Sequence, residues 1–99
     1  MTEKVNWADT IPAYDAIIKE ARELMIQKNH DYGDSWRKMR TISLTDKIRA
    51  KAERIANIED LQMQGKQPLI SEGIEAEYRD ILNYCAFALI KIKEAQENE

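Results

Sequence analysis

The sequence predicts an all-α protein, and two features lead to that prediction. Apolar residues recur three and four positions apart over long stretches, which is the spacing of one helix face, and they do not alternate as they would in a strand. The 99 residues include only three glycines and two prolines, so few positions interrupt a helix. We therefore expect a single domain, residues 1–99, with three main antiparallel helices and one short helix.

The first main helix is expected to begin near Thr10, with Pro12 in its first turn, where the fixed φ of proline suits a helix. It should continue to about Asn29, and residues 1–9 before it are expected to be frayed. A short helix over residues 36–40 should follow. The apolar stripe of the first helix consists of Tyr14, Ile17, Ile18, Ala21, Leu24 and Met25.

The second main helix is expected over residues 43–61, because Ser43 with Asp46 makes a near capping box. Its apolar stripe is Leu44, Ile48, Ala52 and Ile55. Glu59 falls on the same stripe one turn further along, and an acid on an apolar face needs a partner. A basic row flanks the stripe and consists of Lys47, Lys51 and Arg54.

The third main helix follows an interruption at Gly65 and Pro68, and Ser71 with Glu72 provides its start. It should continue to about Lys93, with residues 94–99 frayed. Its predicted core stripe is Ile74, Tyr78, Ile81, Cys85, Leu89 and Ile92. Cys85 is therefore interpreted as a buried packing residue rather than a nucleophile.

Apolar groups surround most of the third helix, because only Asn83, Tyr84 and Lys91 are polar between Ile81 and Ile92. Such a helix is usually buried on more than one side. Three helices from one chain cover it poorly, so we expect a helical bundle completed by formation of a homodimer. The dimer interface should include Ala86, Phe87 and Ile90.

The charge balance excludes some partners. The chain has 15 basic and 18 acidic residues, a net charge of −3, so it has no basic field that would hold a nucleic acid polymer. No apolar run approaches the ~20 residues of a membrane span, and the polar start of the chain does not resemble a signal peptide. One cysteine cannot form an internal disulfide. We expect a cytoplasmic protein without a membrane partner.

Polar and aromatic residues are concentrated between Lys28 and Arg37, around Gly33. Tyr32 and Trp36 offer flat faces to a planar ligand, and Lys28 and Arg37 can neutralise an anion. Asp31 and Asp34 can orient a hydroxyl group, an amino group or a hydrated metal ion. This segment can therefore form part of a nucleotide pocket. The alternative is an ordinary turn between helices, with the aromatic rings packed on the bundle.

Three carboxylates converge if the second and third helices are antiparallel. Glu77 and Asp80 are i,i+3 neighbours at the edge of the predicted core, and the antiparallel pairing brings Glu59 toward them. Three carboxylates from two helices suit a Mg²⁺ or Mn²⁺ ion that keeps several waters. The alternative is that Glu59 is solvated and Glu77 forms a structural ion pair with Arg54 or Lys51.

The order of these features resembles a small bacterial and phage family, the nucleotide modification associated domain, earlier described as a domain of unknown function. The similarity covers residues 20–93. The residues that carry it are Lys28, Asp31-Tyr32-Gly33, Trp36-Arg37, Ser43-Leu44-Thr45-Asp46, Lys51-Ala52, Arg54-Ile55, Glu59, Glu72-Gly73-Ile74, Glu77 and Asn83-Tyr84.

A more distant similarity concerns Glu77-x-x-Asp80, which looks like the ExxD element of the MazG-like all-α nucleotide pyrophosphohydrolases. Those enzymes use Mg²⁺ to cleave nucleoside triphosphates to monophosphate and pyrophosphate. The second helix departs from their pattern. Only Glu59 is well placed there, and Lys51, Arg54 and Ala56 replace an acid-rich ExxE element.

The resemblance implies a dimeric, MazG-like helical bundle that handles a small nucleotide. If it is a hydrolase, Mg²⁺ would bind to Glu59, Glu77 and Asp80. The substrate would contact Lys28, Asp31, Tyr32, Trp36, Arg37, Lys51, Arg54 and Tyr84, while His30 stays outside the catalytic set. A noncatalytic module that binds a nucleotide for a base-modifying enzyme is the first alternative. An interaction scaffold without a ligand is the second.

Overall fold

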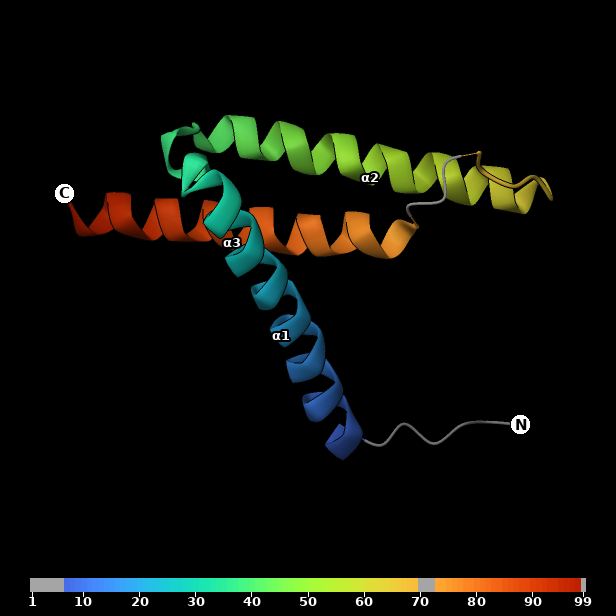
Figure 1. The fold of residues 1–99 in the computed structure, drawn as a ribbon, viewed down its shortest axis with the longest axis horizontal. Helices are drawn as coiled ribbons and strands as arrows, with labels where there is room; N and C mark the ends of the chain where they lie inside the picture. Colours follow the sequence, from blue (N-terminus) through green and yellow to red (C-terminus); the bar gives the residue numbers. More distant parts are fainter. Residues whose placement is uncertain (1–6, 70–72, 99) are drawn as a thin grey trace.

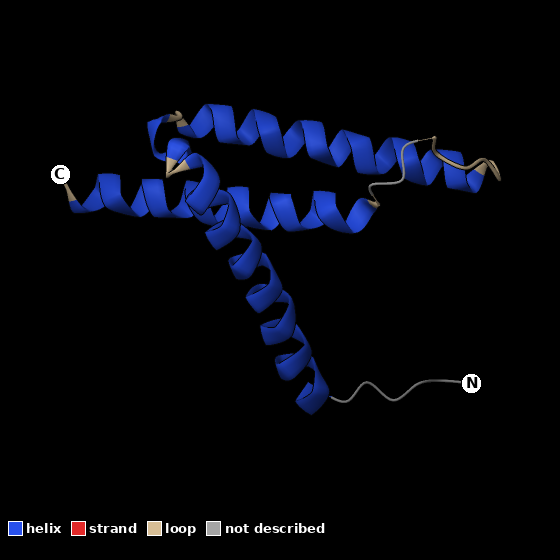
Figure 2. Cartoon of the chain, viewed as in Figure 1, coloured by secondary structure: helices blue, strands red, loops and turns tan. Residues whose placement is uncertain are grey.

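A computed structural model describes residues 7–69 and 73–98 of the chain and shows an all-helical protein. The elements are α1 (Trp7–Tyr32), the short 3₁₀ helix η1 (Ser35–Lys38), α2 (Thr41–Met63) and α3 (Ile74–Glu97) (Figures 1 and 2). No strand occurs among the described residues, so the predicted all-α class is confirmed. None of these helices combines the length and the hydropathy that a membrane-spanning segment needs.

Each main helix differs at its ends from the sequence prediction. The polar segment after Asn29 remains helical as far as Tyr32, and Gly33 then ends α1 with a φ of 65°, its N–H donating to the carbonyl oxygen of Asn29 at 2.7 Å. The predicted helix start at Ser71 and Glu72 lies outside the described residues. Residues 94–97, expected to be frayed, belong to α3.

The helices form an open arrangement rather than a closed three-helix bundle. α2 and α3 lie side by side and antiparallel, as expected, and the end of α2 extends beyond the start of α3 (Figure 1). The C-terminal half of α1 crosses α3 at a steep angle, and the N-terminal half extends away from the pair formed by α2 and α3 (Figure 1). At the crossing, the amide of Asn83 donates to the carbonyl oxygen of Ala21 at 3.1 Å. The N-terminal half of α1 therefore has little cover from its own chain.

The core of the single chain is small. Among the described residues, the buried apolar side chains are Ala21, Trp36, Leu44 and Ile55, and of these Leu44 is fully enclosed. Leu44 and Ile55 belong to the predicted stripe of α2, so that stripe does contact α3 at these two positions. With so few enclosed side chains, the chain has much of its apolar surface in contact with water.

The predicted core stripe of α3 was wrong for the single chain. Tyr78, Cys85, Leu89 and Ile92 are exposed, and the side of α3 that contacts α2 and η1 instead bears Glu77 and a series of partly covered side chains. Apolar residues surround most of α3, so the period of hydrophobicity does not determine which side meets α2. The polar contacts described below require the orientation that is observed.

Candidate functional site

A pocket of about 210 Å³ lies where the C-terminal end of α1, η1 and α3 meet, with one contribution from α2. The volume is below the ~300–1,000 Å³ of pockets that enclose drug-sized ligands, so it suits one part of a nucleotide rather than the whole molecule. Its polar lining includes Lys28, Asn29, Tyr32, Ser35, Lys47, Asp80, Asn83 and Tyr84, and its apolar lining includes Met25, Trp36, Met39 and Phe87.

Trp36 packs within the fold, although it lines this pocket. Its ring stacks on Phe87 with centroids 4.3 Å apart and an interplanar angle of 5°, and the guanidinium carbon of Arg37 lies 4.5 Å from its ring centroid. Only 7% of Trp36 is exposed. Its indole Nε1 is buried without a hydrogen-bond partner among the described residues. The ring faces of Trp36 are thus engaged by its own chain, which is the packing alternative of the sequence analysis.

Tyr32 is the aromatic side chain of the segment that stays open to a ligand. It is 72% exposed at the end of α1 and lines the pocket. Tyr84, in contrast, is partly covered, with its ring edge-on to Phe87 at 6.4 Å and Lys47 Nζ 6.0 Å from its centroid. A planar base therefore has one accessible aromatic face here, that of Tyr32.

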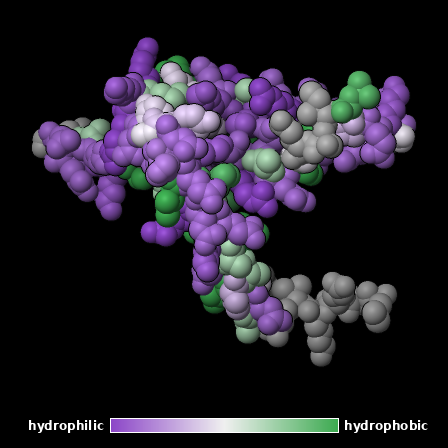
Figure 3. Space-filling view, viewed as in Figure 1, coloured by the Kyte–Doolittle hydropathy of each residue, from purple (hydrophilic) through white to green (hydrophobic). Residues whose placement is uncertain are grey.

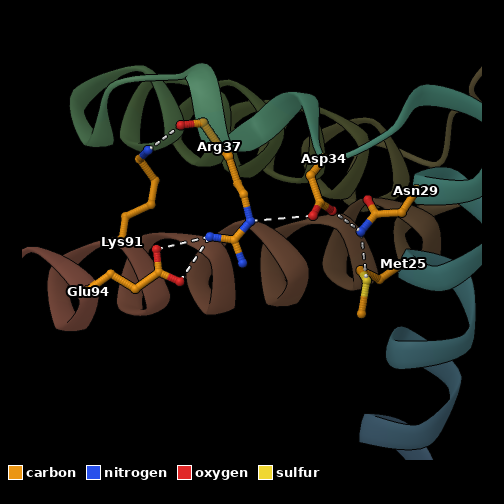
Figure 4. Close-up of polar contacts among 6 residues, drawn as sticks. All are labelled: Met25, Asn29, Asp34, Arg37, Lys91 and Glu94. Carbon is orange, nitrogen blue, oxygen red and sulfur yellow. Dashed lines mark hydrogen bonds and ion pairs between the residues drawn. The ribbon is translucent and has the colours of Figure 1, made fainter.

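Arg37 fastens η1 to α3 (Figure 4). Its Nη1 donates to both carboxylate oxygens of Glu94 at 2.9 Å, and its Nε donates to Asp34 at 3.4 Å. Asp34 also accepts a hydrogen bond from the amide of Asn29 at 2.6 Å, and Lys91 Nζ donates to the backbone oxygen of Arg37 at 2.8 Å. Because its donors are already bound to carboxylates, Arg37 acts as a support for the segment between α1 and α2 in this structure.

A cluster of ion pairs joins α1, α2 and α3 beside the pocket. Lys51 Nζ lies 3.1 Å from Glu77 Oε2 and 3.0 Å from Asp80 Oδ2, and Lys28 Nζ lies 2.9 Å from Asp80 Oδ1. Arg54 approaches Glu77 at 3.9 Å but is 63% exposed. The side chains of Lys51, Glu77 and Asp80 are only 15%, 10% and 16% exposed, so these charges interact at reduced dielectric. We call Lys28, Lys51, Glu77 and Asp80 the charge cluster.

The charge cluster changes two pKa values. Burial alone would raise the pKa of Asp80, but hydrogen bonds from Lys28 and Lys51 outweigh burial and lower the pKa of Asp80 below its ordinary value. Burial alone would likewise lower the pKa of Lys51. Its hydrogen bonds to Asp80 and Glu77 outweigh burial and raise the pKa of Lys51. At neutral pH both groups are therefore charged and paired.

The three carboxylates of the predicted metal site do not come together. Glu59 belongs to the last turns of α2, which extend beyond the start of α3 (Figure 1), and it borders a shallow surface hollow with Ala56 and Met63. Among the described residues, no group of three or more histidine, cysteine, aspartate or glutamate side chains is arranged to hold a metal ion. Glu77 and Asp80 are adjacent but share Lys51 Nζ. Mg²⁺ binding to them remains a prediction that requires displacement of this ammonium group.

Four predicted substrate-contacting residues line the pocket, namely Lys28, Tyr32, Trp36 and Tyr84. Lys51 lies next to it in the charge cluster, whereas Arg54 borders a separate groove between the end of α2 and the start of α3. Asp31 is not among the residues that line the pocket, and it pairs with the neighbouring His30 at 3.1 Å, with 66% of its side chain exposed. His30 is also exposed.

Lys47 is a pocket residue that the site prediction missed. It lines the pocket from α2 and forms no ion pair with any described residue. The sequence places it in the basic row with Lys51 and Arg54, one turn before Lys51, so the signal was present. Only the three-dimensional arrangement distinguishes Lys47, which lies over the ring of Tyr84, from Lys51, which is paired with two carboxylates.

Comparison with known proteins supports one family. Residues 28–92, more than half of the chain, match the family described as nucleotide modification associated domain 1. No curated protein and no solved structure gives a significant match. The matched range contains η1, α2, most of α3, the charge cluster and, apart from Met25, the part of α1 that lines the pocket. The chain therefore belongs to the nucleotide modification associated domain 1 family.

Proposed function

We propose that this member of the nucleotide modification associated domain 1 family is a binding module for a small nucleotide. The observation that supports the proposal most is that one pocket combines an accessible aromatic face on Tyr32 with an ammonium group on Lys47 that forms no ion pair with the described residues. A nucleotide combines a planar base with anionic phosphate, and these two side chains match the two parts. Net charge of −3 on the whole chain argues against a longer nucleic acid as the ligand.

The proposed roles follow from the neighbours of each side chain. Tyr32 stacks on the base from the solvent side. Lys47 contacts phosphate oxygens, and Lys28, which Asp80 holds at 2.9 Å, contributes a second positive group at the same pocket. The side-chain amides of Asn29 and Asn83 already donate hydrogen bonds to Asp34 and to the carbonyl oxygen of Ala21. These two residues therefore form part of the pocket wall and are not assigned a contact with the ligand.

The binding proposal is tested by titrating mono-, di- and triphosphate nucleotides and following heat or thermal stability, because a ligand of the folded state raises its stability. Tyr32→Ala should weaken binding by about 1–3 kcal/mol, while Tyr32→Phe, which keeps the ring, should have little effect. Lys47→Met should weaken the binding of triphosphates more than the binding of nucleosides. Lys66→Met, an exposed lysine outside the pocket, is the matched control.

If no nucleotide showed saturable binding, the proposed function as a binding module would be rejected, and an interaction scaffold without a ligand would be the remaining alternative. Equal affinity of wild-type and Lys47→Met protein for triphosphates would reject the phosphate assignment alone. These two outcomes are separable because nucleoside binding reports on Tyr32 independently of Lys47.

A second candidate function is metal-dependent hydrolysis of a nucleoside triphosphate to monophosphate and pyrophosphate. The observation in its favour is that Glu77 and Asp80 lie one helix turn apart and share a single cation, Lys51, at 3.0–3.1 Å. The residues that surround them do not fit a three-carboxylate metal site, and the positive charges of Lys51 and Lys28 already offset those of the two carboxylates. Binding without turnover is therefore the better supported of the two.

Release of inorganic pyrophosphate distinguishes the two candidates. A hydrolase would release pyrophosphate from a triphosphate in Mg²⁺ or Mn²⁺, and Asp80→Asn would abolish that release. The binding module predicts no release with either ion at nucleotide concentrations that saturate the pocket. Calorimetric titration with Mn²⁺ alone provides a separate measurement of whether Glu77 and Asp80 bind a metal ion.

A further inference from the structure

One side of α3, facing neither α2 nor η1, carries a continuous apolar stripe. Its residues alternate four and three positions apart, the spacing of a helix that packs in a coiled-coil manner against another helix. Tyr78 is 51% exposed, Leu89 67% and Ile92 44%. We call this stripe the α3 seam, and its members are Tyr78, Leu82, Cys85, Leu89 and Ile92.

α1 carries a stripe with the same alternation, made of Ile11, Tyr14, Ile18, Ala21 and Met25. The C-terminal part is covered by the chain itself, since Ala21 is 4% exposed at the crossing with α3. The N-terminal part continues past α3 without cover, and Ile11 and Tyr14 are 68% and 65% exposed. We call Ile11, Tyr14 and Ile18 the α1 stripe. Figure 3 shows hydrophobic side chains at the surface along α1 and on both sides of its crossing with α3.

We propose that a second copy of this chain covers the α3 seam and the α1 stripe together. The exposed fractions of the seven isoleucine, leucine and tyrosine side chains in the two stripes equal about four whole side chains. At about 150–200 Å² for each large side chain, this is about 550–750 Å² on each copy. A specific interface buries roughly 600–1,000 Å² on each partner, so the apolar area of the two stripes reaches the lower part of that range.

The charges beside the stripes favour a second copy over an unrelated partner. Asp15 follows Tyr14 on α1, and Lys93 follows Ile92 on α3. Neither side chain forms an ion pair with the described part of its own chain. When α1 of one copy lies on the α3 seam of the other, the carboxylate of Asp15 and the ammonium group of Lys93 border the same interface. Twofold symmetry repeats the contact, so each copy supplies both surfaces.

This interface differs from the one expected from the sequence, which included Phe87. The ring of Phe87 stacks on Trp36 and lines the nucleotide pocket, so it is committed within the chain. Cys85 and Leu89, expected in the core of the single chain, instead belong to the proposed interface. In this proposal Cys85 and Leu89 are still core residues, but the core to which they belong forms between two chains.

The proposal is tested by measuring mass at a series of protein concentrations, by sedimentation equilibrium or light scattering. The wild-type chain should be dimeric. Leu89→Glu and Tyr14→Glu should each raise the dimer dissociation constant at least about thirtyfold, because each places a charge at the interface twice. Ile42→Glu, at a side chain that is 59% exposed on α2 outside both stripes, is the control and should leave the constant unchanged.

A wild-type chain that stays monomeric up to submillimolar concentration would overturn the proposal. So would a dimer that is as tight in Leu89→Glu or Tyr14→Glu as in Ile42→Glu. Circular dichroism of each variant verifies folding, and the substituted side chains are all more than half exposed in the single chain, so the fold should tolerate the changes.

Cys85, the single cysteine, provides a second measurement. The thiol is exposed in the single chain, so the rate of maleimide labelling should fall as protein concentration rises and the α3 seam is covered. In Leu89→Glu the labelling rate should not depend on concentration. Under oxidising conditions, Tyr14→Cys should form a disulfide between chains that disappears when Cys85 is also changed to serine. Labelling of the wild-type thiol that is equally fast at all concentrations would contradict the proposal.

Discussion

Replacing Lys51 with methionine is the sharpest perturbation of this fold. Lys51 Nζ lies within 3.1 Å of both Glu77 and Asp80, and all three side chains are at most 16% exposed. Methionine keeps much of the volume of the lysine stem but removes the charge. Two carboxylates one helix turn apart would then repel each other, and Glu77 would retain only the distant, solvated Arg54.

The expected loss of stability is about 2–3 kcal/mol at neutral pH. Removing one partner of a fully buried pair costs about 3–5 kcal/mol, and the value is reduced here because some water reaches the cluster and Lys28 still holds Asp80. Urea denaturation followed by circular dichroism measures it. With a slope of about 1–2 kcal/mol per molar, the midpoint should fall by about 1–3 M. Protein concentration must be equal for all variants, because a dimer would make the midpoint depend on it.

Two further variants make the prediction specific. Lys19→Met removes an exposed pair with Glu23, at 3.9 Å and 78% and 58% exposure, and should change stability by less than about 0.5 kcal/mol. Adding Glu77→Gln to Lys51→Met should recover part of the loss, because it removes the repulsion. If Lys51→Met were as stable as Lys19→Met, the charge cluster would have no role in holding α2 against α3.

Further predictions concern pH, packing and the turn after α1. Because the pKa of Asp80 is lowered in the folded state, its stabilising effect should be present at neutral pH and lost as pH falls through that lowered pKa; an Asp80→Asn variant should therefore show a flatter acid denaturation profile below about pH 4. Trp36→Ala should cost about 3–5 kcal/mol in urea denaturation, whereas Tyr32→Ala, at a 72% exposed side chain, should cost less than about 0.5 kcal/mol. Gly33→Ala should cost about 1 kcal/mol in the same assay, because Gly33 has a φ of 65° and the space around it is open, so only backbone strain contributes; an unchanged stability would contradict this.

The sequence predicted the helices well and their mutual arrangement poorly. Periodicity and chain breakers located α1, α2 and α3, because hydrogen bonding and side-chain spacing within a helix are local. The orientation of α3 depends instead on which of its sides meets α2. A helix with apolar groups around most of its circumference offers several such sides, and the ion pairs of Lys51 with Glu77 and Asp80 occur in only one of them.

The candidate site was predicted in part for the same reason. Lys28 and Tyr32 were identified from their residue types and Tyr84 from the family resemblance, and all three line the pocket. Whether an aromatic ring is free to stack on a ligand is a property of its neighbours, and Trp36 is occupied by Phe87 and Arg37. Glu59 was linked to Glu77 on the assumption that the helix ends are level, but α2 extends beyond the start of α3 (Figure 1).

The two sides of α3 explain why its sequence reads as apolar all round. The side toward α1, α2 and η1 holds Phe87 under Trp36 and presents Asp80 to the two lysines of the charge cluster, so this side builds the pocket. The other side is only partly covered in the single chain and keeps a regular four-three spacing, which a merely solvated face would not need. In the proposed dimer, a second chain covers this other side. Such a contact would account for the exposed Cys85 and Leu89 and for the small core of the isolated chain.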